Sequence, residues 1–111
     1  MQYIVTGQFI DPGVSLGIEK FEAMLESGIL PTLATLAKLE SEGKVVGGLP
    51  SGDRALAFIL EARDNHEADQ VIHDLPAWGL LKWEVRPLES FKNRLASDKL
   101  TLERLRAPVN A

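Results

Sequence analysis

The feature that most constrains this fold is residues 54–62, RALAFILEA, which read as a β-strand with two apolar faces. Alternate side chains of a strand point to opposite faces of the sheet. One face carries Leu56, Phe58, Leu60 and Ala62, and the other carries Ala55, Ala57 and Ile59, followed by Glu61. A sheet with one face in water normally alternates apolar and polar residues. We therefore expect both faces of this strand to be covered.

The first half of the chain predicts a strand, two helices and a second strand. Residues 2–10 are rich in β-branched and aromatic residues and lead into the turn sequence Asp-Pro-Gly at 11–13. Residues 15–42 have helical periodicity, but Gly28 and Pro31 interrupt it. Proline is tolerated only in the first turn of a helix, so we expect one helix near 15–27 and another from Pro31 to the C-cap Gly43. Residues 44–49 form a short strand before a turn at 50–53.

The second half predicts the strand at 54–62, one helix, a last strand and a helical tail. Asp64 is the expected N-cap of a helix, with Glu67 in the capping-box position, and Pro76 follows the end of that helix. Residues 80–86 alternate apolar and charged side chains, which is typical of a strand. Beyond Pro87 the chain reads as a charged amphipathic helix. We assign residues 1–88 to one domain and 89–111 to a C-terminal helical tail.

The order β-α-β-β-α-β predicts an α+β fold of the ferredoxin-like kind. Right-handed crossovers would place both helices on one face of a four-stranded antiparallel sheet. Either the tail folds back over the other face, or a second copy covers it and the sheets pair in a dimeric α+β barrel. Pairing is the favoured interpretation, so the expected partner is the chain itself, as a homodimer or larger homo-oligomer.

Charge and composition argue against several classes of partner. Residues 1–85 carry 6 basic and 13 acidic side chains, whereas residues 86–111 carry 6 basic and 3 acidic ones. An acidic chain with a formal charge of -4 is a poor candidate for nucleic-acid binding. No apolar run approaches the roughly 20 residues that span a bilayer, so no membrane partner is expected. The chain has no cysteine, and its start reads as a strand and not as a secretion signal. These features predict a cytoplasmic protein.

Residues 73–88, HDLPAWGLLKWEVRPL, resemble the end of the second helix and the last strand of the muconolactone isomerase family. The segment LESEG at 39–43 resembles that family's exit from its first helix. The likeness covers about residues 30–88. It implies a ferredoxin-like subunit that pairs through its sheets and a proton shift in a small lactone acid, without a metal or an organic cofactor. The family's glutamate on the first long helix, a proposed proton carrier, corresponds to a position near Thr32.

Several side chains are candidates for chemistry. His73 could act as an acid or a base, and Glu22 and Glu26, four positions apart on one helix, could form a carboxylate pair that serves as a base. These three are the catalytic candidates. The candidates for binding a substrate are Trp78 as a lid, Arg54 as a clamp for a carboxylate, and Tyr3 as a polar group of the pocket. A solvated surface role is the alternative for each of them. The spacing of His66 and His73 does not suit a metal, so no metal site is expected.

Three functions remain open at this stage. The first is isomerisation of a small lactone or organic acid without a cofactor. The second is a non-catalytic oligomeric domain that binds a small molecule such as an organic acid. The third is oxygenase chemistry without a cofactor. The first and third need an ionisable group inside a closed pocket, whereas a binding or accessory domain predicts either no pocket or one lined only by apolar side chains.

Overall fold

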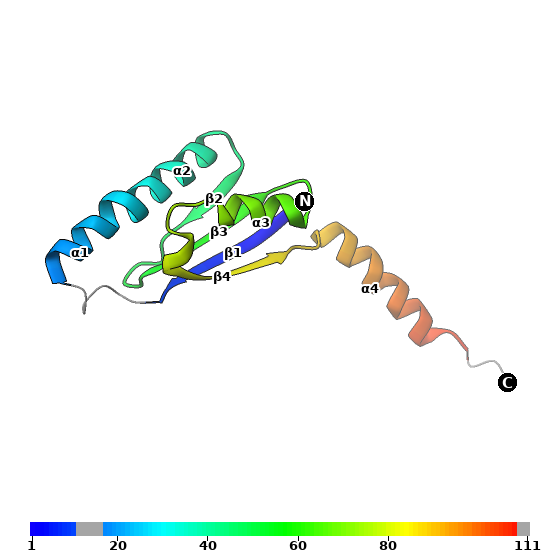
Figure 1. Ribbon diagram of the computed structural model, residues 1–111. Helices are drawn as coiled ribbons and strands as arrows, with labels where there is room; N and C mark the ends of the chain where they lie inside the picture. Colours follow the sequence, from blue (N-terminus) through cyan, green and yellow to red (C-terminus); the bar gives the residue numbers. More distant parts are fainter. Residues whose placement is uncertain (11–16, 109–111) are drawn as a thin grey trace.

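The computed structural model describes residues 1–10 and 17–108, and the expected turn at 11–13 lies outside them. Four strands form one antiparallel sheet in the order β2-β3-β1-β4 (Figure 1). The strands are β1 (Gln2–Phe9), β2 (Val45–Gly48), β3 (Ala55–Glu61) and β4 (Leu81–Pro87). The helices are α1 (Gly17–Met24), α2 (Leu30–Ser41), α3 (Asn65–His73) and α4 (Phe91–Arg106). The predicted α+β class and the four-stranded antiparallel sheet are confirmed.

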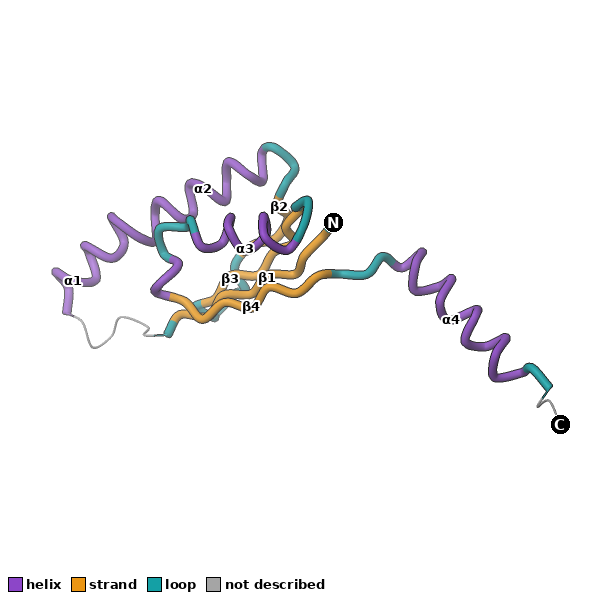
Figure 2. Tube along the Cα trace, turned by 45° about the vertical axis from the view of Figure 1, so that its right-hand side comes forward, coloured by secondary structure: helices purple, strands orange, loops and turns teal. Residues whose placement is uncertain are grey.

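The core lies between the sheet and the layer formed by α1, α2 and α3, which cover the same face (Figure 2). The register pairs Tyr3 with Leu60 and Val5 with Phe58, and all four side chains are buried in this layer. Trp83 of β4 pairs with Gly7 and also points to the helical side. A Cβ atom at Gly7 would lie 2.7 Å from the Trp83 ring, so only glycine fits under this indole.

The helices α1 and α2 are not separated, contrary to the predicted break near Gly28. A π-helical turn, Leu25–Ile29, joins them, and the Leu30 N–H donates to the Leu25 carbonyl. Pro31 lies in the first turn of α2. Its ring would crowd the carbonyl four residues earlier in a regular helix, and the wider π turn accommodates it. The sequence located the irregularity correctly but not its form.

The predicted helix ends are confirmed where local signals are strong. Gly43 has a φ of +75°, and its N–H donates to the Glu40 carbonyl, while the Lys44 N–H donates to Leu39. The Asp64 carboxylate accepts from the Glu67 N–H at 2.9 Å, as an N-cap should. The side chain of Glu67 accepts from the Arg63 N–H and not from Asp64, so the capping box is only half formed.

The second face of the sheet is not covered by the chain's own tail. The helix α4 leads away from the sheet and buries none of its residues (Figure 1). The radius of gyration is 19.6 Å, whereas a compact chain of this length would have about 13 Å. The alternative in which the tail folds back over the sheet is therefore wrong. Over the residues described, no helix is both long enough and apolar enough to cross a membrane.

Candidate functional site

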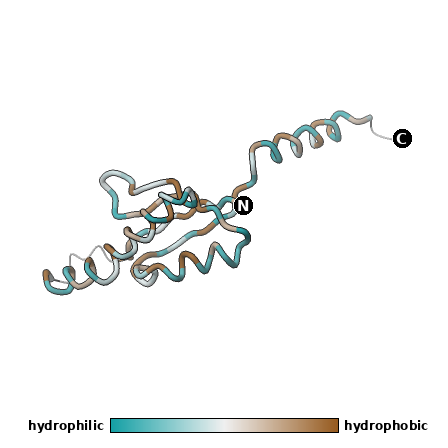
Figure 3. Tube along the Cα trace, turned by 90° about the horizontal axis from the view of Figure 1, so that it is seen from above, coloured by the Kyte–Doolittle hydropathy of each residue, from teal (hydrophilic) through white to brown (hydrophobic). Residues whose placement is uncertain are grey.

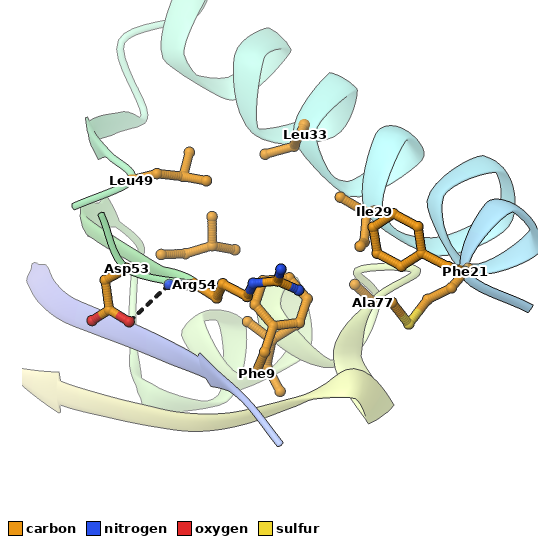
Figure 4. A pocket seen from close by; sticks show the side chains of 11 residues that line it. Phe9, Phe21, Ile29, Leu33, Leu49, Asp53, Arg54 and Ala77 are labelled. Carbon is orange, nitrogen blue, oxygen red and sulfur yellow. Dashed lines mark hydrogen bonds between the residues drawn. The ribbon is translucent and has the colours of Figure 1, made fainter. Parts of the chain in front are cut away.

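An apolar cleft lies between the α1–α2 helix pair and one end of the sheet (Figure 4). Its volume is about 200 Å³. We call it the α1–α2 cleft. Nine apolar residues and two charged ones line it: Phe9, Phe21, Met24, Ile29, Leu33, Leu49, Asp53, Arg54, Leu56, Ala77 and Leu81. A concave apolar site with a few polar groups is the usual form of a small-molecule site.

The sheet places the charged end of the cleft. Arg54 lies at the start of β3, and its carbonyl accepts from the N–H of Phe9 at the end of β1. The turn before β3 closes with a hydrogen bond from the Asp53 N–H to the Pro50 carbonyl. These two contacts fix the backbone from which both charged side chains extend. Sheet pairing therefore brings Arg54 beside Phe9, although 45 positions separate them in the sequence.

The two charged side chains have different roles at this end. The Asp53 carboxylate accepts from the Arg54 N–H at 2.7 Å and from the Gln8 amide at 3.4 Å, so it is turned toward the protein backbone. Figure 4 shows the Arg54 side chain extending into the cleft from the start of β3. A guanidinium can hold a carboxylate through two parallel hydrogen bonds. The geometry of this end thus favours an anion.

The far wall of the cleft is the π turn. Met24, just before this turn, and Ile29, its last residue, both line the cleft, and they are five positions apart because the wider turn adds one residue to the helical repeat. Gly28 in this turn is buried, and a Cβ there would lie 3.1 Å from Leu80. The helix can thus approach the segment before β4 closely. Single π turns occur often at functional sites, and this one shapes the cleft.

A buried hydrogen bond ties the floor of the cleft to α2. Thr32 is 1% exposed and is the one buried polar side chain among the described residues. Its hydroxyl accepts from the Ala77 N–H at 2.8 Å. Ala77 lines the cleft, so Thr32 positions a wall residue. Thr32, near the position of the glutamate in the muconolactone isomerase family, therefore makes a structural hydrogen bond in this protein.

Two predicted site residues, His73 and Trp78, lie together in a different place. Their rings pack with centroids 4.4 Å apart. They belong to an open groove of about 570 Å³ beside α3 and β4, which we call the α3–β4 groove. Its lining is His66, Asp69, Gln70, Ile72, His73, Trp78, Trp83 and Val85. The Trp83 indole N–H donates to the Trp78 carbonyl, which holds the two tryptophans beside each other.

The other predicted residues are distributed over the molecule. Glu22 and Glu26 are exposed on the helical layer and do not line the α1–α2 cleft. Tyr3 is buried in the core, where its hydroxyl donates to the Asn65 side chain at 2.9 Å. Burial, and then the charges of Asp64, Asp69 and Glu67, raise the pKa of Tyr3. Of the six candidates, only Arg54 lies in the cleft.

The sequence contained a signal for the cleft that we did not use. Phe21, Met24, Ile29 and Leu33 are spaced three, five and four apart. A regular amphipathic stripe uses steps of three and four, so the step of five marks one extra residue at the π turn. Asp53 was visible beside Arg54 in the sequence. Phe9 and Leu49 had no local signal, because only the tertiary structure brings their strands to the cleft.

Among the described residues that line the cleft, Asp53 and Arg54 are the only ionisable ones. The apolar walls suit a hydrocarbon chain or ring, and the guanidinium suits a negative charge. Asp53 is the one carboxylate among these lining residues.

No protein-family model matches this chain, and a search of curated proteins found no match either.

Proposed function

We propose that this protein binds a small, largely apolar carboxylic acid in the α1–α2 cleft. The observation that carries the proposal is an apolar cavity with the Arg54 guanidinium at one end. A volume of about 200 Å³ is below the roughly 300–1,000 Å³ of drug-sized sites, which favours a short acid. The binding function is preferred over catalysis because the catalytic candidates His73, Glu22 and Glu26 do not line this cleft.

The role of Arg54 can be tested by comparing ligands and variants in calorimetric titrations. A series of short aromatic and branched carboxylic acids would be titrated beside the matching amides. Hydrogen bonds to charged groups contribute about 1.5–3 kcal/mol, so Arg54→Gln is expected to weaken acid binding by roughly 10- to 150-fold. The amides are expected to bind weakly to both proteins.

Arg63→Gln is the matched control, because Arg63 pairs with Glu67 on α3 and does not line the cleft. This variant should bind the acids like the unmodified protein. Equal binding of acids and amides, or an Arg54→Gln variant with unchanged affinity, would refute the carboxylate clamp.

We also propose that the subunit is ferredoxin-like and works as a homo-oligomer whose sheets pair through their open faces. The βαββαβ element order and the strand order support the first part. In support of the second, Ile4 and Ile59 are cross-strand neighbours on the open face and are only half buried. Val46, the neighbour of Ile59 on the other side, is 69% exposed. Covering large apolar side chains contributes about 1.5–3 kcal/mol each.

Light scattering would test this pairing at micromolar concentration. The expected mass is at least twice the 12.2 kDa of one chain. Ile59→Glu should lower this mass, whereas Ile18→Glu, at a position already 86% exposed on α1, should not. A single-chain mass for the unmodified protein would contradict the pairing.

A proton shift of the muconolactone isomerase kind is the second candidate function, and Asp53 is the observation that favours it. This carboxylate lines the cleft beside Arg54 and could serve as the base for an acidic carbon. Incubation of a lactone acid in deuterated water should then give deuterium exchange that Asp53→Asn abolishes. Oxygenase chemistry without a cofactor would need the same base, and oxygen consumption with the same variant tests it.

A further inference from the structure

The helix α4 has an apolar stripe that no described part of its own chain covers. Phe91, Leu95, Leu102 and Leu105 follow steps of four, seven and three, which places them on one side of the helix. Phe91 is 96% exposed and Leu105 79%. Figure 3 shows hydrophobic and hydrophilic residues alternating along this projecting helix. Such a stripe can pack against a partner surface.

Pairing of α4 with another α4 is disfavoured by charge. Asp98 lies within the stripe, three residues after Leu95 and four before Leu102. A parallel pair, and an antiparallel pair centred on the stripe, would each place the two Asp98 carboxylates against each other. The helix carries five basic and two acidic side chains, so two copies would also repel one another.

The body of the protein offers the opposite charge. Residues 64–74, which form α3 and its ends, contain four acidic side chains and no lysine or arginine. Of these acids, Asp69 lines the α3–β4 groove, while Glu67 is paired with Arg63. Ile72, Trp78, Trp83 and Val85 give the groove an apolar part, and Asp69 places a carboxylate beside it. The apolar residues of α4 and the basic residues next to them therefore find matching groups in this groove.

The start of α4 directs the helix away from the groove of its own chain. The Leu88 N–H donates to the Gln2 carbonyl at 2.8 Å and continues the pairing of β4 with β1 beyond Pro87. Two residues later, the Ser90 hydroxyl accepts from the Asn93 N–H and fixes the first turn. With both ends of this linker held, α4 points outward (Figure 2). A second copy is then the surface that it can reach.

We propose that α4 of one copy docks into the α3–β4 groove of a second copy, with its apolar stripe on Trp78, Trp83 and Val85 and its basic residues against the acids of α3. This contact builds on the proposed self-association, but it uses the helical side of the sheet and not the open face. Each subunit would both give a helix and receive one.

Two properties of the chain make the contact easy to follow. Trp78 and Trp83 are its only tryptophans, and both line the groove, so tryptophan emission reports on docking. Leu102→Glu should shift the emission to longer wavelength and raise the concentration for half-maximal association at least about ten-fold. Leu100→Glu is the matched control, because Leu100 is 54% exposed and lies off the stripe. It should change neither quantity by more than about three-fold.

Because the chain has no cysteine, a disulfide can establish the geometry. A chain with both Val85→Cys and Leu102→Cys should form disulfides between chains on mild oxidation. The combination of Val85→Cys with Ser97→Cys, which lies off the stripe, should not. A disulfide within one chain, or none, would overturn the proposal.

If α4 bound anionic vesicles and no disulfide formed between chains, the docking proposal would be overturned, and a membrane surface would be the partner of α4. Failure of the sheet pairing is recognised separately, because Ile59→Glu alters the open face and leaves the groove and α4 intact.

Discussion

The hydrogen bond between Thr32 and Ala77 gives the sharpest test of how the cleft is held. Thr32→Ser keeps the hydroxyl and removes one methyl group, whereas Thr32→Ala removes both. The two variants therefore differ by the hydroxyl alone. Because Thr32 is only 1% exposed, the Thr32→Ala variant leaves the Ala77 N–H buried without a hydrogen-bond acceptor.

A buried donor without an acceptor lowers the free energy of unfolding by about 1–3 kcal/mol. We expect Thr32→Ala to be less stable than Thr32→Ser by this amount. For a domain of this size, each 1 kcal/mol lowers the melting temperature by roughly 4–8 °C. Urea unfolding, with all proteins at one concentration because association adds to stability, would measure the difference.

Thr35 provides the control on the same helix. Its hydroxyl donates to the Pro31 carbonyl, but the residue is exposed, so its Ser and Ala variants should differ by less than about 0.5 kcal/mol. If the two Thr32 variants were equally stable within about 0.3 kcal/mol, the buried hydrogen bond would not be what holds α2 to the segment before β4.

Three further predictions concern the fold. A Cβ at Gly47 would lie 2.3 Å from the Ala57 carbonyl oxygen, so Gly47→Ala should cost about 1–3 kcal/mol of unfolding free energy in urea, while Gly48→Ala, with open space around it, should not. Asp64→Ala removes the N-cap of α3 and should cost about 1 kcal/mol, with Asp64→Asn close to the unmodified protein in the same assay. Burial raises the pKa of Tyr3, so the neutral phenol stabilises the folded state at pH values below about 10, the ordinary tyrosine pKa, and this contribution to the unfolding free energy is lost as the pH rises above that value. The urea midpoint of the unmodified protein should therefore fall more steeply between pH 8 and 11 than that of Tyr3→Phe. Parallel curves for the two proteins would contradict this prediction.

Local signals in the sequence were enough to predict most of the secondary structure. The strand in residues 54–62, the N-cap Asp64 and the C-cap Gly43 each depend on neighbours within a few positions, and each is confirmed. The form of the irregularity at Gly28 was wrong, because a π turn and a helix break have the same local signature. The fate of the tail was open in the sequence, since amphipathicity shows that a helix needs a partner but not which one.

The sequence by itself determined the order of the elements, the two apolar faces of β3 and the charge difference between body and tail. The tertiary structure decided which side chains share a cavity. It placed Arg54 in the α1–α2 cleft, separated it from His73 and Trp78 in the α3–β4 groove, and gave Thr32 a buried partner 45 residues away. The physical reason is that periodicity and caps are properties of neighbouring residues, whereas a cavity is the space left between elements that meet only after the sheet has formed.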